Sequence, residues 1–382
     1  MKKILFITSN WLTDYGGRRI TTTKIINSLP SRNTDVTVAD FEVTHKVSNR
    51  PYSKKDFGFS TRVNFQQYFL KSNGGTYRYL ATISDKRKYD AVVIVGSTYF
   101  NLTAILAVIA RRLFRGSEKI LFCHTHPLKS IQFISMPPKN FIYHLGYYLL
   151  SYFSYRFFDR IVTPSYGLRQ FFVNRLGTKK ERVFVINNPV FNGRDRNPAI
   201  RRNYDTSTEK VIVTAARLDL FQKDFKTLFK ALKEVNEKMN CRLVILGKGS
   251  DGEKIVALAR KSGIADKVSF PGFVKNPMVF MRKADIFVLS SFFEGSPTVL
   301  VEAMMAGIPV VSSNCDFGPR EILDNGKNGL LVPVGDYKAM ASAVLRLLQD
   351  KKLKEKLIIN GLKRAEFYSE DKSYSLWGRL LK

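Results

Sequence analysis

Short apolar segments alternate with longer stretches of helical pattern along both halves of the 382-residue chain. Five such segments lie in each half, at residues 4–7, 91–95, 120–123, 160–163 and 183–186, and then at 211–214, 243–246, 268–270, 286–289 and 310–312. This alternation is typical of parallel sheets covered by helices. We therefore expect an α/β fold built from two doubly wound, Rossmann-like domains.

A segment around residue 200, rich in Asn, Pro, Gly and charge, separates the two halves and is typical of a linker. The predicted domains are residues 1–195 and 205–365. Residues 366–382 are predicted to form a helix that packs back on the first domain, because no strand follows them. Open parallel sheets bind ligands beyond the carboxyl ends of their strands. The expected binding site is therefore a cleft that the two domains face.

Glu294 and Glu302 lie in the segment that is most informative about function. Glu294 is predicted on the loop after a buried strand, and Glu302 on the helix that follows, with Ser296 as N-cap and Pro297 at the first helical position. A lone glutamate is usually a solvated surface acid. The helix around Glu302 is otherwise almost entirely apolar, however, and a charge is costly to bury there unless something binds it. Acids beside the free N–H groups of a helix start fit a ligand with hydroxyls and phosphate.

Arg217 follows the first strand of the second domain directly, and Lys223 lies six residues further on in the same loop. Two cations at the head of a strand can hold a diphosphate and stabilise it as it departs, since arginine offers a fork of donors and lysine a mobile point charge. By spacing alone, solvated loop cations are an equally good interpretation.

Two features of the first domain lie beyond its predicted strands. Gly16 and Gly17 follow the first strand, and paired glycines at such a turn let the backbone approach a ligand closely, although most pairs of this kind are simple turns. His124 and His126 follow a later strand and are two of only four histidines. No further metal-type ligands accompany them, so a polar contact to a sugar or phosphate, or a core histidine, is the better interpretation.

The segment that begins at Gly247 matches the Gly-x-Gly-x-x-Gly pattern of dinucleotide sites. That pattern belongs after the first strand of its domain and requires an acid about 20 residues later, at the end of the next strand. Here it follows the second strand, and the next strand ends in Phe270-Pro271-Gly272-Phe273. Binding of a nicotinamide dinucleotide is therefore disfavoured.

The formal net charge of +30 is unevenly distributed. Residues 1–200 hold 31 Lys and Arg against 11 Asp and Glu, a net +20, which leaves +10 for the remainder. Such a field attracts nucleic acid, an anionic membrane surface or a phosphorylated substrate. No recognisable nucleic-acid module accompanies it, whereas aromatic segments from Phe65 to Phe69 and from Phe141 to Phe158 favour a membrane surface.

The cysteines and the apolar segments indicate the cellular compartment of the protein and whether it has a structural metal site. Cys123, Cys241 and Cys315 are scattered without pairing or metal-type spacing, which fits a reducing cytoplasm. The amino-terminal segment predicts a first strand rather than a signal peptide, and no apolar run is suited to span a bilayer. We expect a cytoplasmic protein that binds peripherally to the inner face of the membrane.

The second half resembles the nucleotide-sugar domain of the retaining GT-B glycosyltransferases of family 4. The resemblance runs nearly unbroken from about residue 211 to 333, through AARL with Lys223, LGKGSDGEKI, ADKVSFPGFV, ADIFVLSSFFEGSPTVLVEAMMAGIPVVSS, GPREIL and GKNGLLVP. The first domain is similar only at its opening strand, Gly16-Gly17, the region of His124 and FDRIVTPS. Ser296 departs from the bulkier apolar residue that the family often carries there.

The resemblance implies a role for each candidate residue. Glu302 would hold ribose hydroxyls, Glu294 those of the transferred sugar, and Arg217 and Lys223 the diphosphate. The implied catalytic residues are His124, Glu294, Arg217 and Lys223. The implied donor-binding residues are Gly16, Gly17, Arg217, Lys223, Gly247, Phe273, Val274, Glu294, Gly295, Ser296, Pro297, Thr298 and Glu302, with the backbone at Phe273 and Val274 framing the base.

The implied enzyme is a retaining, metal-independent glycosyltransferase without a cofactor. It would move a hexose or N-acetylhexosamine from a UDP-sugar to a growing glycan on a polyprenyl diphosphate carrier, in cell-surface polysaccharide assembly. The absence of an Asp-x-Asp motif and the presence of Arg217 and Lys223 suggest that cations of the protein replace a metal. Two alternatives stay open: a UDP-sugar epimerase on the same fold, and a basic nucleic-acid-binding protein.

Overall fold

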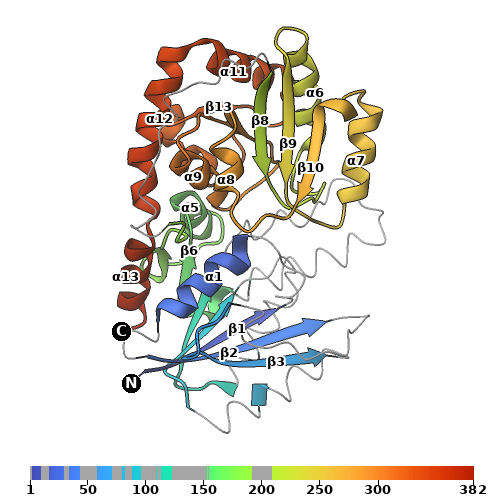
Figure 1. Cartoon of the computed structure of the whole chain (residues 1–382). Coiled ribbons are helices and arrows are strands. Elements are labelled where there is room, and N and C mark those ends of the chain that lie inside the picture. The colour runs from blue at the N-terminus through green and yellow to red at the C-terminus, as the bar shows by residue number, and fades with distance from the viewer. Residues whose placement is uncertain are drawn as a thin grey trace. The chain divides into compact units, whose positions relative to one another are not determined.

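The computed structural model describes residues 2–9, 17–29, 34–43, 58–70, 80–81, 88–95, 109, 113–122, 153, 155–191 and 209–382. Contacts divide the chain into two compact units (Figure 1). Unit 1 is Met1–Pro189 with Ser373–Lys382, and unit 2 is Val190–Lys372. The chain therefore crosses between units near residue 189, against a predicted first boundary at 195, and again near residue 372.

Unit 1 contains a seven-stranded sheet in the order β3-β2-β1-β4-β5-β6-β7. All of its neighbouring strands pair in parallel. Its described elements are β1 (Lys2–Ser9), α1 (Gly17–Ser28), β2 (Thr34–Val43), β3 (Asn64–Leu70), β4 (Ala91–Val95), β5 (Glu118–Phe122), η4 (Tyr155–Phe157), β6 (Arg160–Thr163), α5 (Tyr166–Asn174), η5 (Lys180–Arg182) and β7 (Val183–Val185).

Unit 2 contains a six-stranded parallel sheet in the order β10-β9-β8-β11-β12-β13. Its elements are β8 (Lys210–Ala215), α6 (Phe225–Asn236), β9 (Cys241–Leu246), α7 (Gly252–Lys261), η7 (Ala265–Lys267), β10 (Val268–Gly272), α8 (Met278–Met281), β11 (Ile286–Leu289), α9 (Thr298–Met305), β12 (Val310–Ser313), α10 (Pro319–Ile322), η8 (Asp324–Gly326), β13 (Leu330–Val332), α11 (Tyr337–Gln349), α12 (Lys351–Ala365) and η9 (Glu366–Tyr368).

Helices cover both faces of the sheet in unit 2 because strand β11 is apolar on both sides. Ile286 and Val288 pack with residues of α6 and α11 on one face. Phe287 and Leu289 pack with residues of α8 and α9 on the other. Successive side chains of a strand point to opposite faces, so a continuous apolar run is what a doubly covered parallel strand requires. The predicted α/β architecture is confirmed.

The last helix, α13 (Glu370–Leu380), returns the chain to unit 1. Trp377 is fully buried there and its ring meets that of Phe122 edge-on, with centroids 5.0 Å apart. Leu380 and Leu381 join the same apolar core as strand β1. Burial of a tryptophan and two leucines stabilises this docking by several kcal/mol, at roughly 1.5–3 kcal/mol for each large apolar side chain.

Three observed strands, β2, β3 and β13, are absent from the predicted set. The most consequential is β3, because it contains Phe65 to Phe69, the aromatic segment that the sequence associates with a membrane surface. Phe65 packs against the core of unit 1, and its ring lies 5.3 Å from that of Phe59. At least this aromatic residue therefore serves the fold. Most of Phe141 to Phe158 lies outside the described residues.

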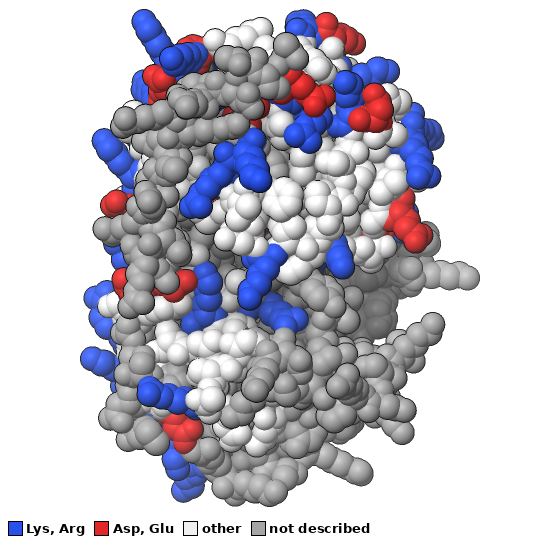
Figure 2. All heavy atoms as spheres, viewed as in Figure 1, with Lys and Arg blue, Asp and Glu red and all other residues white. Residues whose placement is uncertain are grey.

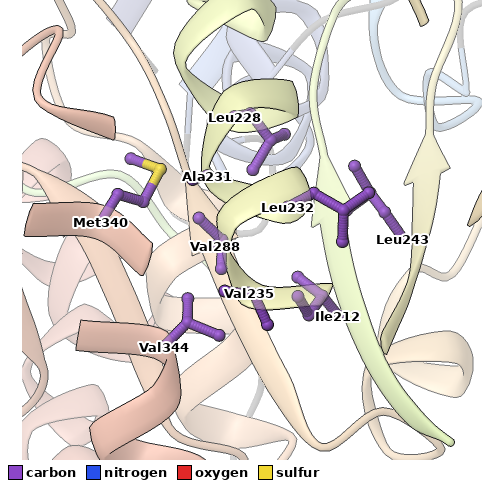
Figure 3. Close-up of a pocket in the computed structure, with 9 residues that line it drawn as sticks. All are labelled: Ile212, Leu228, Ala231, Leu232, Val235, Leu243, Val288, Met340 and Val344. Atoms are coloured by element: carbon purple, nitrogen blue, oxygen red, sulfur yellow. The ribbon is translucent and has the colours of Figure 1, made fainter. Parts of the chain in front are cut away.

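A small apolar void lies between the sheet and helices α6 and α11 of unit 2 (Figure 3). Its volume is about 10 Å³, and its lining is entirely hydrophobic. The nine lining residues are Ile212, Leu228, Ala231, Leu232, Val235, Leu243, Val288, Met340 and Val344. A space this small without polar partners is a packing defect rather than a site for a ligand or a water molecule.

Candidate active site

The loops after β8, β9 and β10 of unit 2 are joined by backbone hydrogen bonds. Leu218 N–H donates to the carbonyl of Lys248 at 3.1 Å, and Gly247 N–H donates to the carbonyl of Gly272 at 2.9 Å. Because all strands of the sheet are parallel, these loops leave from the same edge, beyond the carboxyl ends of the strands. The edge that the sequence predicts for ligand binding is thus one continuous, hydrogen-bonded rim.

The loops after β8 and β11 pair as a short antiparallel ribbon. Lys223 and Ser291 form an isolated β-bridge. On either side of it, Phe292 N–H donates to the carbonyl of Gln222 at 2.9 Å, and Asp224 N–H to that of Ser290 at 3.1 Å. Backbone pairing therefore holds Lys223 beside the loop that carries Glu294.

Glu294 is buried and accepts hydrogen bonds from three side chains. Its Oε1 accepts from the ammonium of Lys223 and from the hydroxyl of Ser291, the latter at 2.7 Å. Its Oε2 accepts from Nε2 of Gln222 at 3.2 Å. The side chains of Lys223 and Glu294 are 9% and 7% exposed, so each charge is removed from water and depends on the other.

One oxygen of Glu294 retains capacity for a ligand. A carboxylate offers about four lone-pair sites, two on each oxygen. Lys223 and Ser291 occupy both sites on Oε1, whereas Gln222 is the only partner of Oε2 among the described residues. The carboxylate therefore keeps an acceptor site on Oε2 that no described residue occupies.

Ser313, at the end of β12, fixes the position of Ser291. Its hydroxyl accepts from Ser291 N–H at 2.8 Å and lies 3.0 Å from the carbonyl oxygen of the same residue. Because Ser291 donates to Glu294, this contact also links Glu294 to strand β12. Neither serine is among the predicted site residues, although hydroxyls at the ends of two adjacent strands are a signal that could have found them.

Arg217 is one-third exposed and is held from one side of its guanidinium. Its Nη2 donates to Oε1 of Gln222 at 3.0 Å and lies 3.4 Å from a carboxylate oxygen of Asp219. Within residues 209–382, Nε and Nη1 have no protein partner. Arg217 thus presents open donors, whereas the structure places Lys223 against Glu294.

Two aspartates hold the loop between Arg217 and Lys223. Asp251 accepts from Leu220 N–H at 3.0 Å, and Asp219 accepts from Phe221 N–H at 2.9 Å. A hydrogen bond from Lys254, and then the one from Leu220, keep the pKa of Asp251 below its ordinary value. The loop is therefore anchored at its centre by an ionised side chain.

Helix α9 begins one residue later than predicted. Pro297 has φ −70° and ψ 100°, which is outside the helical region, so it occupies the N-cap position and Thr298 is the first helical residue. The prediction of Ser296 as N-cap was therefore wrong by one position. Glu302 lies in this helix, as predicted, and is partly buried.

Gly247, Phe273 and Val274 lie at the ends of β9 and β10, on the same rim. Gly247 has φ +142°, and a Cβ there would lie 1.9 Å from the carbonyl oxygen of Ala216. The packing of the two loops therefore requires a glycine at position 247, irrespective of any ligand. Val274 packs against the core of unit 2, whereas Phe273 is 44% exposed.

The predicted residues of unit 1 are only partly described. Gly17 is the exposed first residue of α1. Gly16, His124 and His126 lie outside the described residues, so their predicted roles stay predictions. In the described part of the chain, no group of three or more His, Cys, Asp or Glu side chains is suited to hold a metal ion.

Two family models match the chain in succession. The model described as "Glycosyltransferase Family 4" matches residues 15–191, and the one described as "Glycosyl transferases group 1" matches residues 196–364. The second match contains these loops and the residues Arg217, Lys223, Glu294 and Glu302.

Curated relatives align over part of their own length. The chain is 33% identical over 213 residues to the lipopolysaccharide core biosynthesis glycosyltransferase LpsE of Rhizobium meliloti. This alignment covers 56% of this chain and 60% of LpsE. It is also 33% identical over 147 residues, 38% of this chain and 40% of the relative, to the N-acetylgalactosamine-N,N'-diacetylbacillosaminyl-diphospho-undecaprenol 4-alpha-N-acetylgalactosaminyltransferase of Campylobacter jejuni.

Solved structures share the fold across the whole chain. The Anabaena protein Alr3699/HepE, solved in complex with UDP and glucose, superimposes with a TM-score of 0.75 at 19% identity. The match covers 100% of this chain and 99% of that one. The two family models, which together match residues 15–191 and 196–364, show that the chain belongs to the family 4 glycosyltransferases, and the shared paired parallel sheets show that its fold is GT-B.

Proposed function

We propose that the protein is a retaining, metal-independent glycosyltransferase that moves a hexose or N-acetylhexosamine from a UDP-sugar to a growing, lipid-linked glycan. The observation that carries the proposal is the buried Lys223–Glu294 pair, with one carboxylate oxygen open for a hydroxyl and the donors of Arg217 nearby. Sugar hydroxyls and a diphosphate are the two groups that a nucleotide-sugar brings to such a rim.

The reaction requires that charge be stabilised as the bond between the anomeric carbon and the diphosphate breaks. Arg217 would supply a fixed guanidinium, and the first turn of α9, from Thr298, would supply backbone N–H groups to the departing diphosphate. Lys223 would act through Glu294 as well as through the diphosphate, because its ammonium contacts that carboxylate. Positive groups of the protein thereby take the place that a metal ion has in other enzymes.

Glu294 would hold the transferred sugar rather than attack it. Its Oε1 is engaged by two donors, and its Oε2 accepts from Gln222, so the carboxylate is a hydrogen-bonded acceptor with one open site. In a retaining reaction of this kind, the acceptor hydroxyl attacks from the side of the leaving group, and the departing diphosphate takes its proton. His124, which lies outside the described residues, is proposed to lie near the reacting sugar.

Glu302 is proposed to bind the ribose hydroxyls, and Phe273 to contact the base. Glu302 is partly buried in an otherwise apolar helix. The side chain of Val274 is committed to the core, so the base would meet the backbone of residues 273–274 and the exposed ring of Phe273. Gly16 and Gly17 would approach the phosphates with their backbone.

The proposed substrates draw on the named relatives. The HepE structure contains UDP and glucose, which supports a UDP-sugar as donor. The name of LpsE refers to the lipopolysaccharide core, and that of the Campylobacter relative to a diphospho-undecaprenol acceptor. A glycan that grows on a lipid carrier is therefore the proposed acceptor.

Peripheral binding to the inner face of the membrane is part of the proposal, because a lipid-linked acceptor lies there. The support is the net +20 of residues 1–200. On the face drawn in Figure 2, Lys and Arg of the described residues are spread over both units, with fewer Asp and Glu. No helix within the described residues is long and apolar enough to cross a bilayer. If the protein failed to sediment with phosphatidylglycerol vesicles at low salt, this part of the proposal would be wrong.

A thermal-shift screen against nucleotide-sugars tests the donor class, since a ligand that binds the folded state raises the melting temperature. We expect UDP-linked sugars to raise it, and Glu302→Ala to abolish the shift. Glu237→Ala, at an exposed position after α6, is the matched control and should keep the shift. A response to DNA but to no UDP-sugar would favour a nucleic-acid-binding protein. Conversion of a UDP-sugar in the absence of any acceptor would favour an epimerase.

A further inference from the structure

The side-chain amide of Gln222 lies between the two charged groups of the site. Its Oε1 accepts from Nη2 of Arg217 at 3.0 Å, and its Nε2 donates to Oε2 of Glu294 at 3.2 Å. Gln222 is 8% exposed, so water does not replace these partners. We propose that Gln222 is a positioning residue, which couples the guanidinium that meets the diphosphate to the carboxylate that meets the sugar. The inference rests on the proposed UDP-sugar donor.

The chemistry of the two neighbours permits only one orientation of this amide. A guanidinium donates hydrogen bonds and accepts none, whereas an ionised carboxylate accepts them and donates none. The carbonyl oxygen of Gln222 must therefore face Arg217 and its amino group must face Glu294. Glutamate at this position would keep the acceptor for Arg217, but it would lose the donor for Glu294 and for the Phe293 carbonyl and would set a second, repelling carboxylate against that of Glu294. Methionine, of similar length, would lose both.

The main chain of Gln222 is fixed independently of its side chain. Its carbonyl oxygen accepts from Phe292 N–H in the ribbon, whereas the 3.2 Å contact with the carbonyl oxygen of Phe293 is made by the side-chain Nε2 alone. A substitution of the side chain should therefore leave the ribbon in place. The amide itself has little rotational freedom, as a group that sets the geometry of two others requires.

The coupling has a consequence for binding that a purely structural glutamine would not have. The diphosphate and the sugar of a nucleotide-sugar are joined by one bond, so Arg217 and Glu294 must be spaced to match it. If Gln222 sets that spacing, loss of its amino group should weaken recognition of the sugar while the diphosphate still binds. Loss of both polar atoms should weaken recognition of both parts.

The test compares Gln222→Glu and Gln222→Met in the full-length protein by calorimetric titration. The probes are UDP and whichever of UDP-glucose, UDP-galactose and UDP-N-acetylglucosamine binds the unmodified protein most tightly. The measured quantity is the sugar ratio, defined as the Kd for UDP divided by the Kd for the UDP-sugar. We expect Gln222→Glu to bind UDP within about threefold of the unmodified protein and to lower the sugar ratio about tenfold. A displaced Glu294 would lose its hydrogen bond from the sugar, and a hydrogen bond to a charged group is worth at least that factor.

For Gln222→Met we expect the same loss of sugar ratio and, in addition, UDP binding that is about tenfold weaker. Gln349, exposed at the end of α11, provides matched controls, and Gln349→Glu and Gln349→Met should change neither quantity. Thermal melting of every variant reports on folding. Should Gln222→Met not fold, Gln222→Glu decides alone through the ratio.

Two outcomes separate this inference from the proposed function. If the unmodified protein bound neither UDP nor any UDP-sugar, the proposed donor class would be wrong. If it bound them, but Gln222→Glu weakened UDP and UDP-sugar by the same factor or changed neither, the coupling role of Gln222 would be overturned and the donor class would stand.

Discussion

A Cβ atom placed on Gly318 would lie 2.6 Å from Cδ of Pro297 and 3.0 Å from Cα of Ser296. Gly318 also has φ +79°, a conformation that other residues rarely adopt. The loop after β12 is thus packed against the start of α9 with no space for a methyl group. Ser296 and Pro297 connect Glu294 to the first turn of α9, so the positions of both depend on the packing of Gly318 against these two residues.

We predict that Gly318→Ala inactivates the enzyme beyond its cost in stability. The added methyl group must displace Pro297, and with it the N–H groups proposed to meet the diphosphate. The measurement is turnover per folded molecule, with the folded fraction taken from thermal melting. Gly326→Ala is the control, because Gly326 has φ +95° and a Cβ there would meet nothing within 4 Å. Both variants should lose about 1–2 kcal/mol from the backbone conformation alone, but only Gly318→Ala should lose activity. Equal activities would contradict the prediction.

Arg217→Ala should lower kcat by about 10²–10³-fold, as loss of one preorganised donor to a departing anion does. The two nitrogens without a protein partner within residues 209–382 are those expected to stabilise the diphosphate. Arg217→Lys should recover only part of the rate, because a point charge lacks the fork of donors. The rate is read from release of UDP under saturating donor. A rate close to that of the unmodified enzyme would remove Arg217 from leaving-group stabilisation.

The parts of the site that the sequence predicts are those whose chemistry is local. Glu294 and Glu302 are recognisable because an acid on a loop and another in an apolar helix are unusual within one short segment. Arg217 and Lys223 are recognisable as cations at the head of a strand. Their partners are not local: the amide of Gln222 meets Glu294 across 72 residues of chain. Such a contact arises only when two loops pair at one edge of a sheet.

The strands that sequence patterning missed are short or polar. Strand β13 has three residues, which is too short for a periodic signal. Strand β3, with the sequence NFQQYFL, carries two glutamines among its aromatic residues and so lacks the continuous apolar run of a buried strand. Pairing with β2 along seven register positions, rather than intrinsic pattern, defines it. The start of α9 was misplaced because Pro297 is compatible with both N-cap and first-turn positions, and its ψ decides between them.

Cys241 should be unreactive in the folded protein. Burial, and then the nearby carboxylate of Asp285, raise the pKa of its thiol to about 11. The pKa of an unfolded cysteine thiol is about 8.5. The stability that the neutral thiol contributes to the folded state is therefore fully present below about pH 8.5 and is lost as pH rises through about 11. At pH 9, iodoacetamide should label Cys241 in 8 M urea and spare it in buffer, as read by peptide mass spectrometry with Cys241→Ala as reference. Rapid labelling of the folded chain would show that the thiol is accessible and ionised.

The buried pair of Lys223 and Glu294 should be strongly coupled in stability. Removal of one partner leaves the other charge buried, which typically costs about 3–5 kcal/mol. Lys223→Met and Glu294→Gln should therefore each destabilise the protein by an amount of that order, whereas the double variant should cost clearly less than the sum. Urea unfolding of the four proteins gives the coupling energy, and the exposed pair Lys327 and Asp324 supplies a control cycle with a value near zero. Additive costs for Lys223 and Glu294 would show that the two charges do not depend on each other in the unliganded site.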